Sequence, residues 1–418
     1  MKRLSLILLF WLWTIPAYAA DLQTQIDATP AGGTLYLTAT TYNGNYYITQ
    51  PITIIGQEGT KIRSMTKAPA ITIEDTNQVT LENITMEAQQ RAIVIKKANE
   101  VTVTHTKMSN VNAGIFVQQA KDIHIKDNYI TGTAAHYAKK GNGIALYQST
   151  DVTIQNNTIQ QVQDGIYIEN VQRIRIDHNN VTNSRYGTHF MYSEDGEVWH
   201  NTYEDNVTGL MVMMVDGFAA GNNTIRRHMQ INGSGMTLYD VKNAKVRANT
   251  ITENRIGLAL QMTAQTSIKA NQFNMNQTAF EAIKTDRTTA LMANYFQGNI
   301  LTARSDAKGV LLQRNAYDDY HGIDPNNSGY GETPYYAYSS FGQWMVRQPA
   351  YQFFIASPSV TLLTALDQQA SGGNVLQDDQ PKMMQSSVTV KQINYTQLLI
   401  GIAFILVAIV VWWRNVKR

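Results

Sequence analysis

The fold is decided by a repeat, which is clearest in two consecutive stretches, GIYIENVQRIRIDHNNVTNSRY (165–186) and GTHFMYSEDGEVWHNTYEDNVT (187–208). Each stretch is 22 residues long, opens on a glycine and carries an asparagine fourteen residues later. That pairing recurs in seven units, at Gly114, Gly143, Gly165, Gly187, Gly209, Gly235 and Gly257 and at Asn128, Asn157, Asn179, Asn201, Asn223, Asn249 and Asn271. A period of this length indicates a solenoid, in which each unit buries its apolar face against its neighbours.

Apolar residues recur within a unit at one and three residues after the glycine, at nine and eleven, and at sixteen. This spacing predicts three short strands whose side chains alternate between interior and surface. Glycine and asparagine are expected at corners that need left-handed or crowded backbone, and inward asparagines can bond in a ladder. We therefore predict an all-β fold, a right-handed parallel β-helix over residues 21–314, with Gly32–Ile55 capping its N-terminal end.

The first twenty residues have the pattern of a secretory signal peptide. Residues 1–20 combine a basic start, an apolar run and the small-residue site Ala17-Tyr18-Ala19, so cleavage is expected at Ala19 or Ala20. The alternative is an uncleaved anchor, for which the apolar run is short.

The other end predicts one transmembrane helix. Residues 393–413 are 21 residues without a charge and end in two tryptophans, and the basic tail 414–418 follows. The positive-inside rule places that tail in the cytoplasm and the preceding chain outside the cytoplasmic membrane, in a single-pass topology. Residues 371–392 are polar and contain Gly-Gly, which predicts a linker. A buried core helix is the alternative for 393–413.

Composition excludes several classes of protein. With 44% hydrophobic and 16% charged residues, the chain is not disordered, and a net charge of +2 offers no basic surface for nucleic acid. The absence of cysteine excludes disulfides, thiolate metal sites and a cysteine nucleophile. The soft or borderline ligands that remain are 16 methionines and 8 histidines.

Methionine and histidine gather on one predicted outward face. If the residues one and three after each glycine point inward, those at two and four point outward. This places His189 beside Met211, and Met191 beside Met213, on neighbouring coils about 4.8 Å apart. Imidazole and thioether ligands suit Cu(I). Two alternatives remain, namely methionines packed under a covering loop and a methionine-rich docking surface.

Two units carry insertions of seven and four residues, each just before the next outward-facing strand. We expect both insertions to form loops at one corner beside the outward face. They contain His136 and the pair His228 and Met229, which are accessory candidates for metal binding, although simple surface loops would have the same pattern.

A carbohydrate-active enzyme would need more acidic residues on the outward face. Glycosidases use a pair of carboxylates, whereas the two outward columns carry only Glu169. The Asp-Pro-His motif of alginate epimerases is also absent, because the sequence reads Asp324-Pro325-Asn326. We therefore expect no catalytic residues. The alternative is a surface-anchored carbohydrate-binding or carbohydrate-active β-helix, which the outward tyrosines Tyr147, Tyr167 and Tyr239 would favour.

Residues 315–370 lack the repeat and are predicted to form a capping and partner-docking segment. Ser357 and Pro358 predict the start of a helix that runs to about Gln369. This helix either packs against the end of the rod or docks onto a membrane partner.

Three stretches resemble the NosD family. NAYDDYHGIDPNNSGYGETPYY (315–336) and QPAYQFFIASPSVTLLTALD (348–367) closely resemble the family's C-terminal part, and RYGTHFMYS (185–193) looks like its His-x-Met-x-Ser stretch. The resemblance covers about residues 21–370. Where the family has a Gly-Asp-Gly-rich segment, this chain reads NNSGYG (326–331), and the C-terminal anchor is not general in the family.

The resemblance implies an extracytoplasmic accessory protein of an ABC transporter, used in denitrification. Such a protein would work with the permease and its ATPase, with nitrous oxide reductase, whose copper–sulfur centre it helps to mature, and with a copper chaperone. His189 and Met191 correspond by motif, and Met211 and Met213 are added from the predicted stacking. Cu(I) would be held transiently, with no tightly bound cofactor and no catalytic role. The membrane would be contacted through the C-terminal helix, and no nucleic acid would be bound.

Overall fold

The structure is a computed structural model that describes residues 21–133, 135–306, 309–337, 341, 344–345, 348–369 and 376–384. The predicted signal peptide, transmembrane helix and cytoplasmic tail lie outside these ranges, and the predicted linker 371–392 is described only in part. Within the described ranges, no helix is both long enough and apolar enough to span a membrane.

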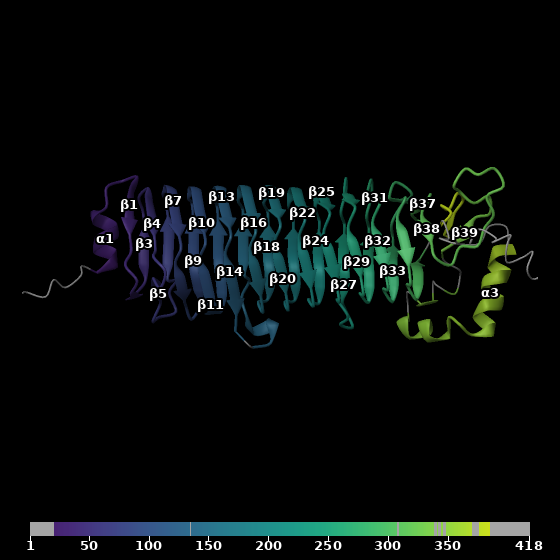
Figure 1. Cartoon of the computed structure of the whole chain (residues 1–418), viewed down its shortest axis with the longest axis horizontal. Coiled ribbons are helices and arrows are strands. Elements are labelled where there is room, and N and C mark those ends of the chain that lie inside the picture. Colours follow the sequence, from purple (N-terminus) through teal and green to yellow (C-terminus); the bar gives the residue numbers. More distant parts are fainter. Residues whose placement is uncertain are drawn as a thin grey trace, which may run out of the picture.

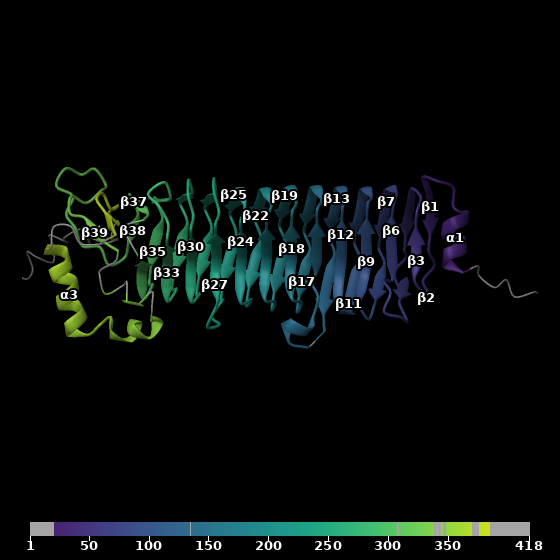
Figure 2. The same ribbon diagram turned by 180° about the vertical axis from the view of Figure 1, so that it is seen from behind.

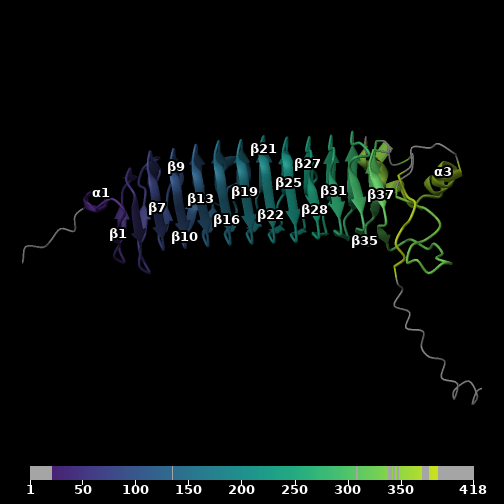
Figure 3. The same ribbon diagram turned by 90° about the horizontal axis from the view of Figure 1, so that it is seen from above.

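Three sheets run along a rod, and each coil adds one strand to each sheet (Figures 1 and 3). Sheet A contains β1 (Gly33–Tyr36), β4 (Ile52–Ile55), β7 (Asn77–Glu82), β10 (Asn99–Thr104), β13 (Lys121–Lys126), β16 (Thr150–Gln155), β19 (Gln172–Asp177), β22 (Glu194–Trp199), β25 (Asp216–Gly221), β28 (Lys245–Arg247), β31 (Ser267–Lys269), β34 (Ala290–Met292), β37 (Leu311–Gln313), β40 (Gln377–Asp378) and β39 (Tyr335–Tyr336).

Sheet B follows sheet A along each coil. It contains β2 (Thr41–Asn43), β5 (Lys61–Arg63), β8 (Thr85–Glu87), β11 (Lys107–Val111), β14 (Tyr129–Gly132), β17 (Thr158–Gln160), β20 (Asn180–Thr182), β23 (Thr202–Glu204), β26 (Thr224–Arg226), β29 (Thr250–Thr252), β32 (Gln272–Asn274), β35 (Tyr295–Gln297) and β38 (Ala316–Tyr317).

Sheet C completes the coil. It contains β3 (Tyr46–Ile48), β6 (Ile71–Glu74), β9 (Arg91–Lys96), β12 (Ala113–Gln118), β15 (Ile144–Tyr147), β18 (Asp164–Glu169), β21 (Tyr186–Met191), β24 (Thr208–Met213), β27 (Ser234–Tyr239), β30 (Ile256–Gln261), β33 (Thr278–Ile283) and β36 (Leu301–Ser305). Neighbouring strands are parallel except for the pair of β39 and β40. The predicted parallel β-solenoid, its period and its three strands per coil are confirmed.

The repeat glycines are required by close approach and not by left-handed backbone, so of the two reasons expected above the crowded backbone applies. Each described repeat glycine lies outside the positive-φ region, whereas the residue before each ladder asparagine, such as Asn156, has a φ of 56°. A Cβ on Gly187 would lie 2.5 Å from the carbonyl oxygen of Gly209 on the next coil and 2.4 Å from the ring of Tyr203. Glycine is required because neighbouring backbones and core side chains occupy that space.

Inward asparagines form the predicted ladder at the corner between sheets A and B. The Nδ2 of Asn179, for example, donates to Oδ1 of Asn201 over 3.0 Å, and the backbone N–H of Asn179 donates to the same oxygen over 2.8 Å. We call this the first ladder. A second ladder, which the sequence analysis did not predict, runs through the corner between sheets B and C and includes Asn206, Asn254 and Asn276.

The two ends of the rod are closed by different elements (Figures 1 and 2). The helix α1 (Leu22–Ala28) caps the N-terminal end and buries Leu22 and Ile26. This corrects the prediction that Gly32–Ile55 is the cap, because those residues form the first coils. At the other end the β-helix continues through β38, slightly beyond the predicted boundary at residue 314.

Part of the predicted linker is instead built into the cap. The strand β40 pairs with β37, and the buried Asp378 accepts hydrogen bonds from the backbone N–H groups of Arg314 and Asn315 and from Nδ2 of Asn315. The last coil would otherwise leave these donors unpaired, and a carboxylate satisfies all three of them. Residues 376–384 therefore belong to the folded end of the rod and are not a free tether.

The capping segment carries the 3₁₀ helix η2 (Pro349–Phe354) and the helix α3 (Pro358–Gln369), and α3 agrees with the predicted helix. Val360 is buried in a small cluster with Leu301, Phe341 and Met345. Phe353 is 84% exposed and Leu362 is 62% exposed. Val360 of α3 thus packs against the end of the rod, while other apolar side chains of the same segment are exposed to solvent.

Candidate functional site

The outward face of sheet C brings the four predicted residues together. His189 on β21 pairs in register with Met211 on β24, and Met191 pairs with Met213 on the same strands. We call these four residues the His/Met patch. Their placement on adjacent coils agrees with the predicted register, and it follows because residues at two and four after the glycine alternate with the buried ones.

His189 is held by a carboxylate from the preceding coil. Its Nδ1 lies 3.0 Å from Oδ2 of Asp164, which is the first residue of β18. An ionised carboxylate only accepts hydrogen bonds, so Nδ1 carries a proton, and whenever the ring holds a single proton Nε2 keeps its lone pair. The residue is only 6% exposed, and Nε2 is buried without a hydrogen-bond partner among the described residues. The rings of Tyr167 and Tyr186 meet the imidazole edge-on, with centroids at 5.1 and 4.9 Å.

Asp164 is fully buried and is kept ionised by two partners. Burial alone would raise its pKa, but the hydrogen bonds from His189 and from Arg185 hold the pKa of this carboxyl below its ordinary value. The guanidinium of Arg185 reaches both carboxylate oxygens, at 2.8 and 2.7 Å. Neither Asp164 nor Arg185 is among the residues predicted from the sequence. An acidic residue directly before a repeat glycine, where most units have none, was the signal available.

The three methionines are partly exposed, which disfavours the alternative in which a loop covers them. The hydroxyl of Tyr167 lies 3.4 Å from Sδ of Met191 and also donates to Glu169 over 2.6 Å. The His/Met patch therefore combines one buried nitrogen lone pair with thioethers that solvent and a partner protein can reach.

Two protein-family models match this chain. The model described as "Periplasmic copper-binding protein (NosD)" matches residues 126–328, and the model described as "Right handed beta helix region" matches residues 52–196. The chain is a NosD-type β-helix protein. The β-helix model agrees with the predicted hand of the helix, and the residues matched by the NosD model include the whole His/Met patch. A comparison with curated protein sequences returns no match.

Solved structures similar to this NosD-type chain are carbohydrate-active enzymes. The A-module of mannuronan C-5 epimerase AlgE6 from Azotobacter vinelandii has a TM-score of 0.55 and 14% identity, over 72% of this chain and 94% of its own. The periplasmic alginate epimerase AlgG has a TM-score of 0.52 and 15% identity, over 69% and 84%. The catalytic unit of an α-1,3-glucanase from Streptomyces thermodiastaticus has a TM-score of 0.53 and 12% identity, over 70% and 62%. At these identities the likeness shows the fold alone.

The accessory candidates lie in different surroundings. The insertion with His136 forms η1 (Tyr137–Lys139), and the imidazole accepts a hydrogen bond from the backbone N–H of Ala138 at the start of that helix. Met229 is half exposed in the second insertion. Both insertions connect sheet B to sheet C, as predicted, and project from the same side of the rod in Figure 1.

The prediction that His228 lies in an inserted loop is wrong. It is fully buried and takes the place of an asparagine in the second ladder. The N–H of Asn206 donates to its Nδ1 over 3.1 Å, and its own N–H donates to Asn254 over 3.1 Å. It is 22 residues after Asn206, so the stacking continues through it and the insertion begins only afterwards. His228 therefore does not belong to the outward face.

Replacing His228 with asparagine is expected to reduce the loss of stability in acid. Burial lowers the pKa of His228 to about 4, from an ordinary value of 6.5. Between these pH values the unfolded chain binds a proton that the folded chain refuses, so stability is complete above pH 6.5 and falls as the pH decreases toward 4. Between pH 7.5 and 5 the wild type should lose about 2 kcal/mol more of its unfolding free energy than His228→Asn does. Urea unfolding at both pH values measures this, and equal losses would contradict it.

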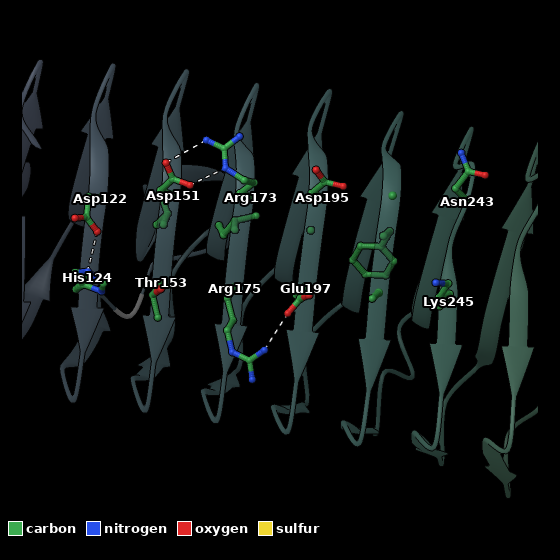
Figure 4. Close-up of a pocket in the computed structure, with 16 residues that line it drawn as sticks. Asp122, His124, Asp151, Thr153, Arg173, Arg175, Asp195, Glu197, Asn243 and Lys245 are labelled. Atoms are coloured by element: carbon green, nitrogen blue, oxygen red, sulfur yellow. Dashed lines mark hydrogen bonds and ion pairs between the residues drawn. The ribbon is translucent and has the colours of Figure 1, made fainter. Parts of the chain in front are cut away.

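A second candidate surface of the NosD-type chain is a charged groove of about 650 Å³ along the outward face of sheet A (Figure 4). Two outward columns line it, which are Asp122, Asp151, Arg173 and Asp195 in one and His124, Thr153, Arg175, Glu197 and Lys245 in the other. We call it the charged groove. These acidic residues were not predicted, because the two outward columns that carry only Glu169 both lie on sheet C.

Most of the strong charges in the groove are paired across neighbouring strands. Arg173 binds Asp151 at 2.7 Å, and its guanidinium lowers the pKa of that carboxyl. Arg175 binds Glu197 at 2.9 Å. Ion pairs of this kind between neighbouring strands stabilise a sheet face modestly and need no ligand.

Proposed function

We propose that this chain is an extracytoplasmic accessory protein that holds Cu(I) transiently at the His/Met patch and passes it on during maturation of the copper–sulfur centre of nitrous oxide reductase. The observation that carries the proposal is the buried Nε2 of His189, which has no hydrogen-bond partner in the described part of the chain, while Nδ1 of the same ring is held by Asp164. A buried polar atom without a partner is costly and calls for an explanation. A metal ion would provide the missing partner.

The residues present fit Cu(I). Metal-binding histidines commonly donate their other ring N–H to a carboxylate, as His189 donates to Asp164. The neighbouring thioethers of Met211, Met191 and Met213 are soft ligands, which Cu(I) prefers over Mg²⁺ or Ca²⁺. The copper would be cargo, and the chain's own part is to orient the imidazole and to present sulfur at the surface.

Partial exposure suits a transfer role. A resident cofactor is usually enclosed by its ligands, whereas the three methionines are reachable from one side. A copper chaperone or the reductase could therefore replace the thioethers one at a time while His189 keeps its hold. We propose no catalytic step for this chain.

The capping segment is proposed as the surface that docks on an ABC permease with its ATPase. Phe353, Phe354 and Leu366 are each more than half exposed, on the same segment from which Val360 packs into the end of the rod. Exposed apolar groups at this density are typical of interaction surfaces. The predicted transmembrane helix 393–413, which follows this segment in the sequence, would keep it at the cytoplasmic membrane.

Co-purification from the native membrane tests both parts. The full chain, captured through a C-terminal tag, should bring an ABC permease and its ATPase with it and should contain copper by elemental analysis. In a His189→Ala chain the copper should fall at least about fivefold while the partners remain, because the two surfaces are separate. Absence of both copper and transporter subunits from the wild-type preparation would contradict the proposal.

A carbohydrate role is the second candidate, and the charged groove favours it. The groove and the fold shared with alginate epimerases both suit a polymer lying along the rod. Glycan-array binding and uronate-polymer turnover of the wild-type chain and of Glu197→Gln would test it. Turnover that disappears in the variant would favour this role over the copper role.

A further inference from the structure

The corner between sheets A and B carries two stacked histidines outside the His/Met patch. His178 follows β19 and His200 follows β22, each at the position just before a residue of the first ladder. Both backbones are left-handed, with φ of 55°, and their N–H groups donate to Trp199 and Gly221 on the next coil, each over 3.1 Å. The backbone therefore fixes both residues, one coil apart, before any ligand binds.

One carboxylate oxygen faces both rings. Oδ1 of Asp177 lies 2.8 Å from Nδ1 of His178 and 3.0 Å from Nδ1 of His200. The two rings are stacked with centroids 4.6 Å apart, and one ligand atom from each of the three residues falls within a 4.8 Å span. Bonds of about 2.0–2.1 Å to a tetrahedral metal place its ligand atoms about 3.3 Å apart. Small side-chain adjustments therefore suffice to admit an ion.

Arg175 orients the carboxylate of Asp177 through its other oxygen, Oδ2. Nη2 of Arg175 binds Oδ2 of Asp177 at 2.7 Å, and Nη1 of the same guanidinium binds Glu197 at 2.9 Å (Figure 4 shows the second contact). Two carboxylates and one guanidinium sum to a charge of −1, so the surroundings favour a cation. Asp177 is buried while both histidines are exposed, which leaves one side of the cluster open to solvent.

We propose that Asp177, His178 and His200 form a binding site for a divalent transition ion, Zn²⁺ or Cu²⁺. Two imidazoles and a carboxylate match the donor preference of these ions, and the set contains no thioether. Three protein ligands leave a fourth position for water or for a partner's side chain. The site is separate from the His/Met patch, which lies on sheet C and uses soft ligands, so it does not depend on the proposed copper function.

The same cluster would also be stable without metal, with His200 donating an N–H to Oδ1 of Asp177 and His178 lying beside the same oxygen. Zn²⁺ titration of the metal-stripped full chain in detergent distinguishes the two cases. Asparagine is the suitable replacement, because Asn156 and Asn222 occupy the same corner position one coil before and one coil after the two histidines. The matched control is His124→Asn, which removes an exposed histidine that lies 3.0 Å from Asp122 but has no second histidine.

The wild-type chain should bind one equivalent of Zn²⁺ at this site. His178→Asn and His200→Asn should each weaken binding at least about tenfold, the double variant should lose the site, and His124→Asn and His189→Ala should retain it. Thermal unfolding of the metal-free variants checks that they remain folded. The proposal is overturned if the double variant binds Zn²⁺ as tightly as the wild type, or if the wild type binds none at about 100 μM.

Discussion

The double variant His189→Ala/Met211→Ala is expected to bind Cu(I) at least about 100-fold more weakly than the wild-type chain, in an anaerobic competition titration with a Cu(I) chelator. The substitutions remove the buried Nε2 of His189 and the thioether of Met211, the residue paired in register with His189 on the next coil. A 100-fold loss of affinity corresponds to about 2.7 kcal/mol of binding free energy, which is modest for the removal of two side chains that would bind Cu(I) directly. Met191 and Met213 remain in this variant and explain why some binding persists.

The matched control removes one histidine and one methionine elsewhere on the surface. His124 and Met65 are both exposed, so His124→Ala/Met65→Ala changes the composition equally and should leave Cu(I) affinity unchanged. Equal Cu(I) affinity in the two double variants would contradict Cu(I) binding at the His/Met patch. It would leave the proposed docking on an ABC permease unaffected.

Asn157→Ala is expected to destabilise the rod by about 3–5 kcal/mol, because it removes a whole rung of the first ladder. The Oδ1 of Asn157 accepts from the backbone N–H and from Nδ2 of Asn128, each over 3.0 Å. Its Nδ2 donates to the backbone oxygens of Ile125 and Gln155 and to Oδ1 of Asn179. All of this lies in the interior, where water cannot replace the lost partners.

The neighbouring residue provides the control. Asn156 is an exposed amide with left-handed backbone, and the chain already places Ala248 and Ala270 at the equivalent corner positions. Asn156→Ala should therefore cost less than about 1 kcal/mol. Urea unfolding measures the difference, and hydrogen exchange should show faster exchange around residues 125–130 in Asn157→Ala alone. Similar unfolding midpoints for the two variants would contradict the role given to the ladder.

The repeat made the fold predictable, because a fixed spacing decides both which residues face inward and which coils lie beside each other. The pairing of His189 with Met211 followed from that spacing, and the strand register agrees with it. The spacing did not reveal why glycine is required at the first position of each unit. Spacing alone cannot separate a left-handed backbone from close contact, and Gly187 is limited by contact with the next coil.

Partners in other coils were harder to find. Asp164 contacts His189 across 25 residues of sequence, so a search within one unit does not reveal it. Sequence spacing places His228 in a loop because the four inserted residues follow it closely, although its distance of 22 residues from Asn206 already indicates the second ladder. The strand β40 comes from a polar stretch that resembles a linker, and its role depends on the unpaired groups of a coil more than 60 residues earlier.

Whether copper sits at the His/Met patch can be measured by X-ray absorption at the copper edge, with the full chain loaded anaerobically with one equivalent of Cu(I). The account predicts one nitrogen and at least two sulfur neighbours around copper, with the sulfur signal reduced by about half in Met211→Ala. A spectrum with nitrogen and oxygen neighbours alone would place the copper away from the outward face of β21 and β24 and would contradict the account.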